Sequence, residues 1–86
     1  MPYLIHWSEK SVKFLEKLPK EISNRIVAKV DSIKEAPFKY VEHYEGKSYF
    51  KLRIGDYRAL IDIDTANNLI EVRIVGNRKN IYKNIG

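Results

Sequence analysis

The chain has 86 residues, of which 44% are hydrophobic and 31% are charged. This size and composition predict one globular domain over residues 1–86 and argue against a disordered chain. Cysteine is absent, which excludes disulfides and thiolate metal sites and fits a reducing compartment. No apolar run approaches the roughly 20 residues that span a bilayer, and the start lacks a signal-peptide pattern. We therefore expect a cytoplasmic protein with no membrane partner.

The positive charge is concentrated in the second half of the chain. The net charge is +5, with eight Lys and Arg against seven Asp and Glu in residues 1–46, and eight against four in residues 47–86. The electrostatic field of this excess positive charge raises the local concentration of phosphate-bearing partners. A merely solubilising surface would carry the same charge, so charge alone leaves both interpretations open.

The first half of the sequence predicts one strand followed by two helices. Residues 3–7 are apolar and β-prone, and Ser8 is typical of a helix N-cap. Residues 9–18 and 20–36 follow as helices, because apolar side chains recur in both at helical spacing. These side chains are Val12, Leu15, Leu18, Ile22, Ile26, Val30 and Ile33. With a proline after each segment, the pattern predicts a helical hairpin with one apolar side.

The second half predicts three strands after a loop over residues 37–46. The strands are residues 47–54, 57–64 and 69–75, joined by turns at residues 55–56 and 65–68. The order β-α-α-β-β-β predicts a small α+β domain, in which the helical hairpin packs on one face of an antiparallel sheet. The other face of the sheet would then meet solvent or bind a ligand.

Strand alternation gathers cationic side chains on that open face. The predicted inward positions are Phe50, Leu52, Ile54, Ala59, Ile61, Ile63, Ile70, Val72 and Ile74. The outward positions are Lys47, Tyr49, Lys51, Arg53, Arg58, Leu60, Asp62, Glu71 and Arg73. We expect one patch formed by Lys51, Arg53, Arg58 and Arg78, with Lys79 beside them and Tyr49, Tyr57 or Tyr82 nearby. Interleaved rings and cations suit single-stranded RNA, whereas the alternative is a face of surface ion pairs to the acidic residues.

Familiar catalytic arrangements are missing, so we expect neither a metal nor a cofactor. His6 and His43 lack the spacing of metal ligands. Asp62 and Asp64 could bind a metal ion, but two aspartates in this arrangement are more often solvated or paired with neighbouring arginines. RNA cleavage by the ribose 2′-hydroxyl needs no metal in principle. Arginines can stabilise the phosphorane, a lysine with a depressed pKa can act as the general base, and a tyrosine can orient the substrate or donate a proton.

The chain resembles the RelE/ParE toxin superfamily of prokaryotic toxin–antitoxin systems over essentially its whole length. The resemblance rests on Tyr49-Phe50-Lys51-Leu52-Arg53-Ile54-Gly55-Asp56-Tyr57-Arg58 and on Ile74-Val75-Gly76-Asn77-Arg78-Lys79-Asn80-Ile81-Tyr82. It implies a RelE-like endoribonuclease that cuts mRNA in the ribosomal A site by 2′-hydroxyl attack without a metal. It also implies a RelB-like antitoxin as the partner.

The resemblance also implies roles for individual residues. Lys51 is similar to a catalytic lysine, and Arg58 and Arg78 to the arginines that stabilise the phosphate. Tyr82 is similar to the C-terminal tyrosine that stacks on or orients the base. Arg53, Tyr49 and Lys79 are expected to bind substrate. Tyr49 stands where RelE-like sequences often carry a second lysine, and Asn77 where many carry a histidine, so Lys51 is the first candidate for the general base.

Two other functions share the same fold. A ParE-like toxin would poison DNA gyrase without cutting RNA, and a degenerate toxin would only bind nucleic acid. The joint presence of Lys51, Arg58, Arg78 and Tyr82 favours the RelE-like interpretation.

Overall fold

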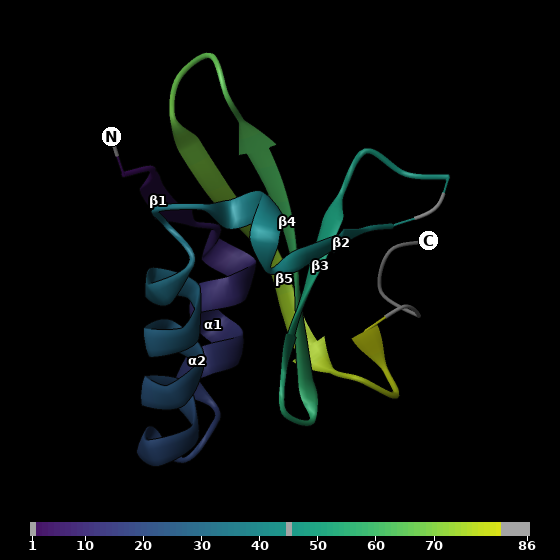
Figure 1. Cartoon of the computed structure of the whole chain (residues 1–86). Helices are drawn as coiled ribbons and strands as arrows, with labels where there is room; N and C mark the ends of the chain where they lie inside the picture. The colour runs from purple at the N-terminus through teal and green to yellow at the C-terminus, as the bar shows by residue number, and fades with distance from the viewer. Residues whose placement is uncertain (1, 45, 82–86) are drawn as a thin grey trace.

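Two α-helices, one 3-10 helix and five strands make up the described chain in the computed structural model, which describes residues 2–44 and 46–81 (Figure 1). The elements are β1 (Leu4–Trp7), α1 (Glu9–Glu16), α2 (Lys20–Ser32), η1 (Pro37–Lys39), β2 (Val41–His43), β3 (Phe50–Ile54), β4 (Tyr57–Asp64) and β5 (Leu69–Asn77). This arrangement confirms the predicted α+β fold class. It contains one strand more than predicted, because β2 forms where the sequence predicts a loop.

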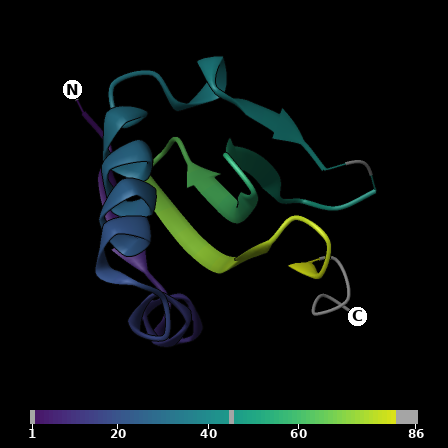
Figure 2. The same ribbon diagram turned by 90° about the horizontal axis from the view of Figure 1, so that it is seen from below.

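The sheet has the strand order β1-β5-β4-β3-β2. The pairs β3–β4 and β4–β5 are antiparallel, as predicted, and the unpredicted pair β2–β3 is antiparallel too, whereas β1 pairs with β5 in parallel. Both α-helices lie on one side of the sheet, and residues 78–81, which follow β5, lie on the other side (Figure 2). The predicted open face therefore exists, and the C-terminal part of the described chain approaches it.

The helical hairpin is held to the sheet by an apolar face and by hydrogen bonds from serines at the start of α1. Ser8 caps α1, since its hydroxyl oxygen accepts a hydrogen bond from the backbone N–H of Ser11 at 3.0 Å. The fully buried Ser11 hydroxyl in turn donates to the carbonyl of Val72 on β5 at 3.2 Å. Val12, predicted in the apolar stripe, is 41% exposed instead, because α1 turns Ser11 and Phe14 toward the sheet.

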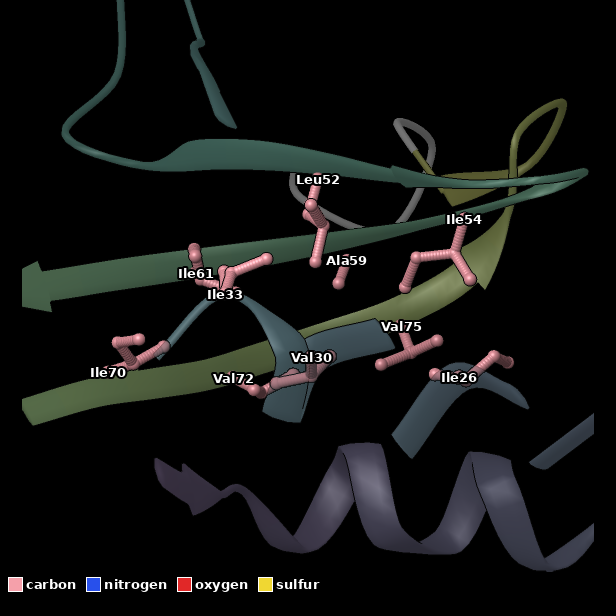
Figure 3. Packing of buried hydrophobic residues seen from close by; sticks show 10 residues of the cluster. All are labelled: Ile26, Val30, Ile33, Leu52, Ile54, Ala59, Ile61, Ile70, Val72 and Val75. Atoms are coloured by element: carbon pink, nitrogen blue, oxygen red, sulfur yellow. The ribbon is translucent and has the colours of Figure 1, made fainter. Parts of the chain in front are cut away.

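The core lies between α2 and the sheet (Figure 3). Its ten buried side chains are Ile26, Val30, Ile33, Leu52, Ile54, Ala59, Ile61, Ile70, Val72 and Val75. Burying each large aliphatic side chain contributes about 1.5–3 kcal/mol before entropy is subtracted. This one-sided burial determines which face of each strand is left for other contacts.

A β-bulge in β5 changes the predicted alternation. Leu60 on β4 pairs with Ile74 and Ile61 pairs with Val72, so Arg73 is an additional residue on β5. Beyond this bulge the faces are exchanged: Val75 enters the core at 4% exposure. The prediction that Ile74 points into the core was therefore wrong. Ile74 instead pairs beside Leu60 on the open face.

The β3–β4 hairpin is closed by a two-residue turn. Gly55 has φ +59°, whereas Asp56 has no positive φ, which is the pattern of a type II′ turn with glycine at the first central position. Because this turn fits the twist of the strands, the basic residues on either side of it are held in a defined register. Neither helix in the described part of the chain has the length and apolar character needed to cross a bilayer.

Candidate phosphate-binding site on the open face

A pocket of about 490 Å³ opens on the sheet face away from the helices, beside the β3–β4 turn. We call it the basic pocket. Its lining residues are Glu42, Lys51, Arg53, Arg58, Arg78 and Lys79. Five of the seven predicted site residues therefore come together, from β3, from β4 and from the segment after β5. With five cations and one carboxylate, the pocket is suited to a polyanion.

Arg58 is the most constrained of these cations. It is only 8% exposed, and its Nη1 donates to the carbonyls of Gly55 and Tyr57, both at 2.7 Å. No carboxylate of the described residues forms an ion pair with it. A guanidinium remains charged at any physiological pH, so within residues 2–44 and 46–81 this buried charge is balanced by carbonyl dipoles and not by a carboxylate. The arrangement leaves Arg58 able to gain strongly from a bound anion.

Arg53 lies directly opposite Arg58 across the hairpin. Like charges at facing positions of an antiparallel pair destabilise a sheet, and two facing arginines have no structural advantage of their own. A phosphate group between them would remove the repulsion and accept hydrogen bonds from both guanidinium groups. The register of the hairpin thus favours anion binding at this point.

Arg78 and Lys79 reach the pocket on a segment that is anchored at both ends. The backbone N–H of Arg78 donates to the carbonyl of Asp56 at 2.9 Å, and its Nε lies 4.0 Å from the Asp56 carboxylate. On the other side, Ile81 is fully buried against Gly76, where an added Cβ would meet the Ile81 Cβ at 3.3 Å. Glycine at position 76 therefore allows the segment to lie close to β5.

Glu42 was not predicted as a site residue. Its strand, β2, lies in the segment predicted as a loop, and only its pairing with β3 places Glu42 opposite Lys51. The Glu42 carboxylate is 3.8 Å from the Lys51 Nζ. Three residues with one apolar side chain carry no readable alternation, so the signal was too short to find from the sequence. The pair places a proton acceptor beside a cation in the same pocket.

The three predicted tyrosines have different positions. Tyr49 lies outside the basic pocket, in a neighbouring hollow, where the Arg73 guanidinium is 4.7 Å from its ring centroid. Tyr57 packs against the core and contacts Phe14 edge-on at 6.3 Å, so its predicted proximity to the patch was wrong. It lies there because residues 54 and 57 pair on the core face. Tyr82 lies outside the described residues.

The acidic residues of β4 are engaged with neighbours. Asp62 pairs with Arg73 at 3.0 Å, as the surface ion-pair alternative predicts for this part of the face. Asp64 accepts hydrogen bonds from the side chain and backbone of Asn67, and these bonds hold the pKa of the Asp64 carboxyl below its usual value. Within residues 2–44 and 46–81, no group of three or more acidic or histidine side chains is placed to hold a metal ion.

Solved toxin structures share this architecture. The chain superposes on a protein of the RelBE2 toxin–antitoxin complex from Mycobacterium tuberculosis with a TM-score of 0.81 and 25% identity, over 91% of this chain and 100% of that one. For the archaeal RelE–RelB complex from Pyrococcus horikoshii the TM-score is 0.77 and the identity 26%, over 91% and 97%. A free mutant of the E. coli toxin RelE shares the fold, with a TM-score of 0.76 and 22% identity over 95% and 90%.

The domain is thus a small α+β toxin of the RelE/ParE superfamily. A family profile described as the ParE toxin of the type II toxin–antitoxin system parDE matches residues 5–82, and the chain belongs to this family. A comparison with curated proteins finds no match. The chain is the toxin of a type II toxin–antitoxin system.

Proposed function

We propose that this toxin is a ribosome-dependent endoribonuclease that cleaves mRNA in the A site and thereby inhibits translation. The observation that carries the proposal is the buried Arg58, which faces Arg53 in a pocket with five cations and one carboxylate. Fixed guanidinium groups stabilise the negative charge that develops on phosphate during 2′-hydroxyl attack. The likeness to the RelE–RelB structures supports the proposal at the level of the fold.

In this mechanism Arg58 and Arg53 bind the non-bridging oxygens of the scissile phosphate. Arg78, on the anchored segment, stabilises the phosphorane or the departing 5′-oxygen, and Lys79 contacts a neighbouring phosphate. Lys51 or its neighbour Glu42 accepts the proton of the 2′-hydroxyl, since both line the pocket and lie 3.8 Å apart. Tyr82 follows the same segment and would orient the base.

An antitoxin is the expected partner, because the similar structures from Mycobacterium tuberculosis and Pyrococcus horikoshii are toxin–antitoxin complexes. We propose a RelB-like antitoxin whose acidic residues cover the basic pocket. Charge complementarity would both speed the association and block RNA entry. The proposed place of action is the cytoplasm, where translating ribosomes are found.

Inhibition of DNA gyrase is the second candidate function, because the matching family profile is that of ParE toxins. A gyrase inhibitor would use the fold for protein binding and would require no phosphate pocket. The basic pocket therefore favours the nuclease, although a positive surface alone also suits a partner bound to DNA.

Induction of the toxin in a permissive cell distinguishes the two functions. We expect rapid arrest of protein synthesis and new transcript 5′ ends that lie in frame with codons. Gyrase-linked DNA breaks without such ends would establish the second candidate. A folded Arg58→Ala protein should lose the cuts, whereas Arg25→Ala, which removes an exposed cation from α2, should retain them.

A further inference from the structure

A second hollow of about 330 Å³ lies on the same sheet face, around the β5 bulge. We call it the bulge pocket. It is lined by Ser8, Lys10, Tyr49, Leu60, Glu71, Arg73 and Ile74. Its volume falls within the range of about 300–1,000 Å³ that is usual for small-ligand sites. Nothing in the phosphate chemistry proposed above uses it.

The two pockets are neighbours on the sheet. Lys51 of the basic pocket pairs directly with Leu60 of the bulge pocket across β3 and β4. Tyr49 directly precedes β3 and stands two residues before Lys51, and the rise of an extended chain places their Cα atoms about 7 Å apart. A nucleotide with its phosphate in the basic pocket could therefore place a base, its own or the next one, in the bulge pocket.

The charge of the bulge pocket differs from that of the basic pocket. The Arg73 guanidinium is paired with Asp62 at 3.0 Å, and the lining contains one further cation, Lys10, and one further carboxylate, Glu71. A second phosphate would therefore find no excess of positive charge there. A planar, uncharged group would find the half-buried apolar side chain of Ile74, which pairs with the buried Leu60, and the flat surfaces of Tyr49 and Arg73. These are the contacts that single-stranded nucleic-acid sites provide for bases.

The bulge itself makes the flat surface rigid. The extra residue on β5 turns both Arg73 and Ile74 toward the open face. The Ser8 hydroxyl donates to the Arg73 carbonyl at 2.7 Å, Asp62 holds the guanidinium, and the Tyr49 ring lies 4.7 Å from it. A preorganised stack of this kind costs little entropy when a base binds. Glu71 can accept a hydrogen bond from an exocyclic amino group of that base.

We propose that the bulge pocket is a nucleobase subsite, which binds one base of the RNA whose phosphate lies in the basic pocket. This inference rests on the proposed function, because it takes RNA as the substrate. It names the part of the substrate that the sheet recognises beyond the scissile phosphate. It also assigns a role to Tyr49 and Arg73, which lie outside the catalytic pocket.

The test is a binding cycle with a non-cleavable RNA tetranucleotide carrying 2′-O-methyl groups and with four matched oligomers, each lacking one base. Affinities are measured by NMR titration for the wild type, Tyr49→Leu, Arg78→Ala and the control Arg25→Ala. In the wild type, loss of the base at one position should weaken binding about tenfold or more. The Tyr49→Leu protein should bind the intact oligomer as weakly as the wild type binds this abasic oligomer. Removal of the same base should then weaken binding to Tyr49→Leu no further. Arg78→Ala should weaken all oligomers equally.

Equal abasic effects in the wild type and in a folded Tyr49→Leu protein would overturn the subsite, as would failure of every oligomer to bind. Retained RNA binding with lost antitoxin affinity in Tyr49→Leu would overturn it as well and would assign the pocket to the antitoxin. Oligomer binding with the expected base dependence, but without cleavage on programmed ribosomes, would instead refute the nuclease function and leave the subsite standing.

Discussion

Two arginines on adjacent strands of the same sheet face have opposite surroundings. Arg73 on β5 is paired with Asp62 and stacked on Tyr49, and its side chain remains 43% exposed. Arg58 on β4 is 8% exposed and faces Arg53, and among the described residues its side chain donates to backbone carbonyls and pairs with no carboxylate. An arginine that is paired with a carboxylate is already stabilised electrostatically. An arginine without such a partner gains most of its stabilisation when an anion binds. The difference separates the proposed phosphate site from the proposed base site.

The largest expected effect is that of Arg58→Ala on cleavage. Removal of a fixed group that stabilises transition-state charge costs about 100–1,000-fold in rate, and Arg58 should lie at the upper end because it is buried. Arg73→Ala should reduce the rate of cleavage far less. Single-turnover cleavage on programmed ribosomes measures both, with circular dichroism as the check on folding. Equal losses in the two variants would remove the contrast between the two arginines.

Arg78→Ala should impair cleavage strongly while the fold stays intact. Its side chain is 55% exposed and the segment is held by the Arg78 backbone N–H and by Ile81, neither of which the substitution removes. We expect a loss of about a hundredfold. Growth arrest and transcript 5′ ends after induction provide the measurement, and undiminished arrest by a folded variant would refute the assignment.

Lys51→Ala should slow the chemical step by about a hundredfold, the lower end of general acid–base effects, with a smaller change in ribosome binding. Glu42→Gln keeps the shape of its side chain and removes only the proton acceptor. If Glu42 is the base, this variant should lose the acid limb of the pH–rate profile, whereas Lys51→Ala should retain it. Unchanged single-turnover rates in both variants would exclude the pair from proton transfer.

The smallest effects concern stability. Arg53→Thr should raise the free energy of unfolding by a few tenths of a kcal/mol, since it removes a like-charge contact worth about 0.2–1 kcal/mol. Arg73→Thr should lower it by a similar amount, because an ion pair with a partly exposed carboxylate is lost. Urea denaturation at low and high salt measures both, and salt should reduce each change. A destabilised Arg53→Thr protein would mean that the facing arginines do not repel each other.

The elements with strong local signals were predictable from the sequence. The Ser8 cap, Pro19 before α2 and the Gly55-Asp56 turn depend on neighbouring residues only, and the structure has each of them where predicted. The predicted end of the second helix at residue 36 was wrong, because α2 ends at Ser32 and Pro37 instead begins the 3-10 helix η1. The shared position of Lys51, Arg53 and Arg58 followed from the alternation along β3 and β4. Strand β2 was missed, because three residues carry no alternation and form a strand only by pairing with β3.

The sequence by itself determined the helical hairpin, the β4 strand and the basic character of the open face, since these depend on spacing and charge along the chain. Only the tertiary structure decided that β5 has a bulge, that Ile74 and Val75 exchange faces, and that Glu42 lies beside Lys51. It also decided that Arg58 is buried without a carboxylate partner among the described residues. Register and burial arise from pairing between distant segments, and no local pattern records which partner a strand will meet.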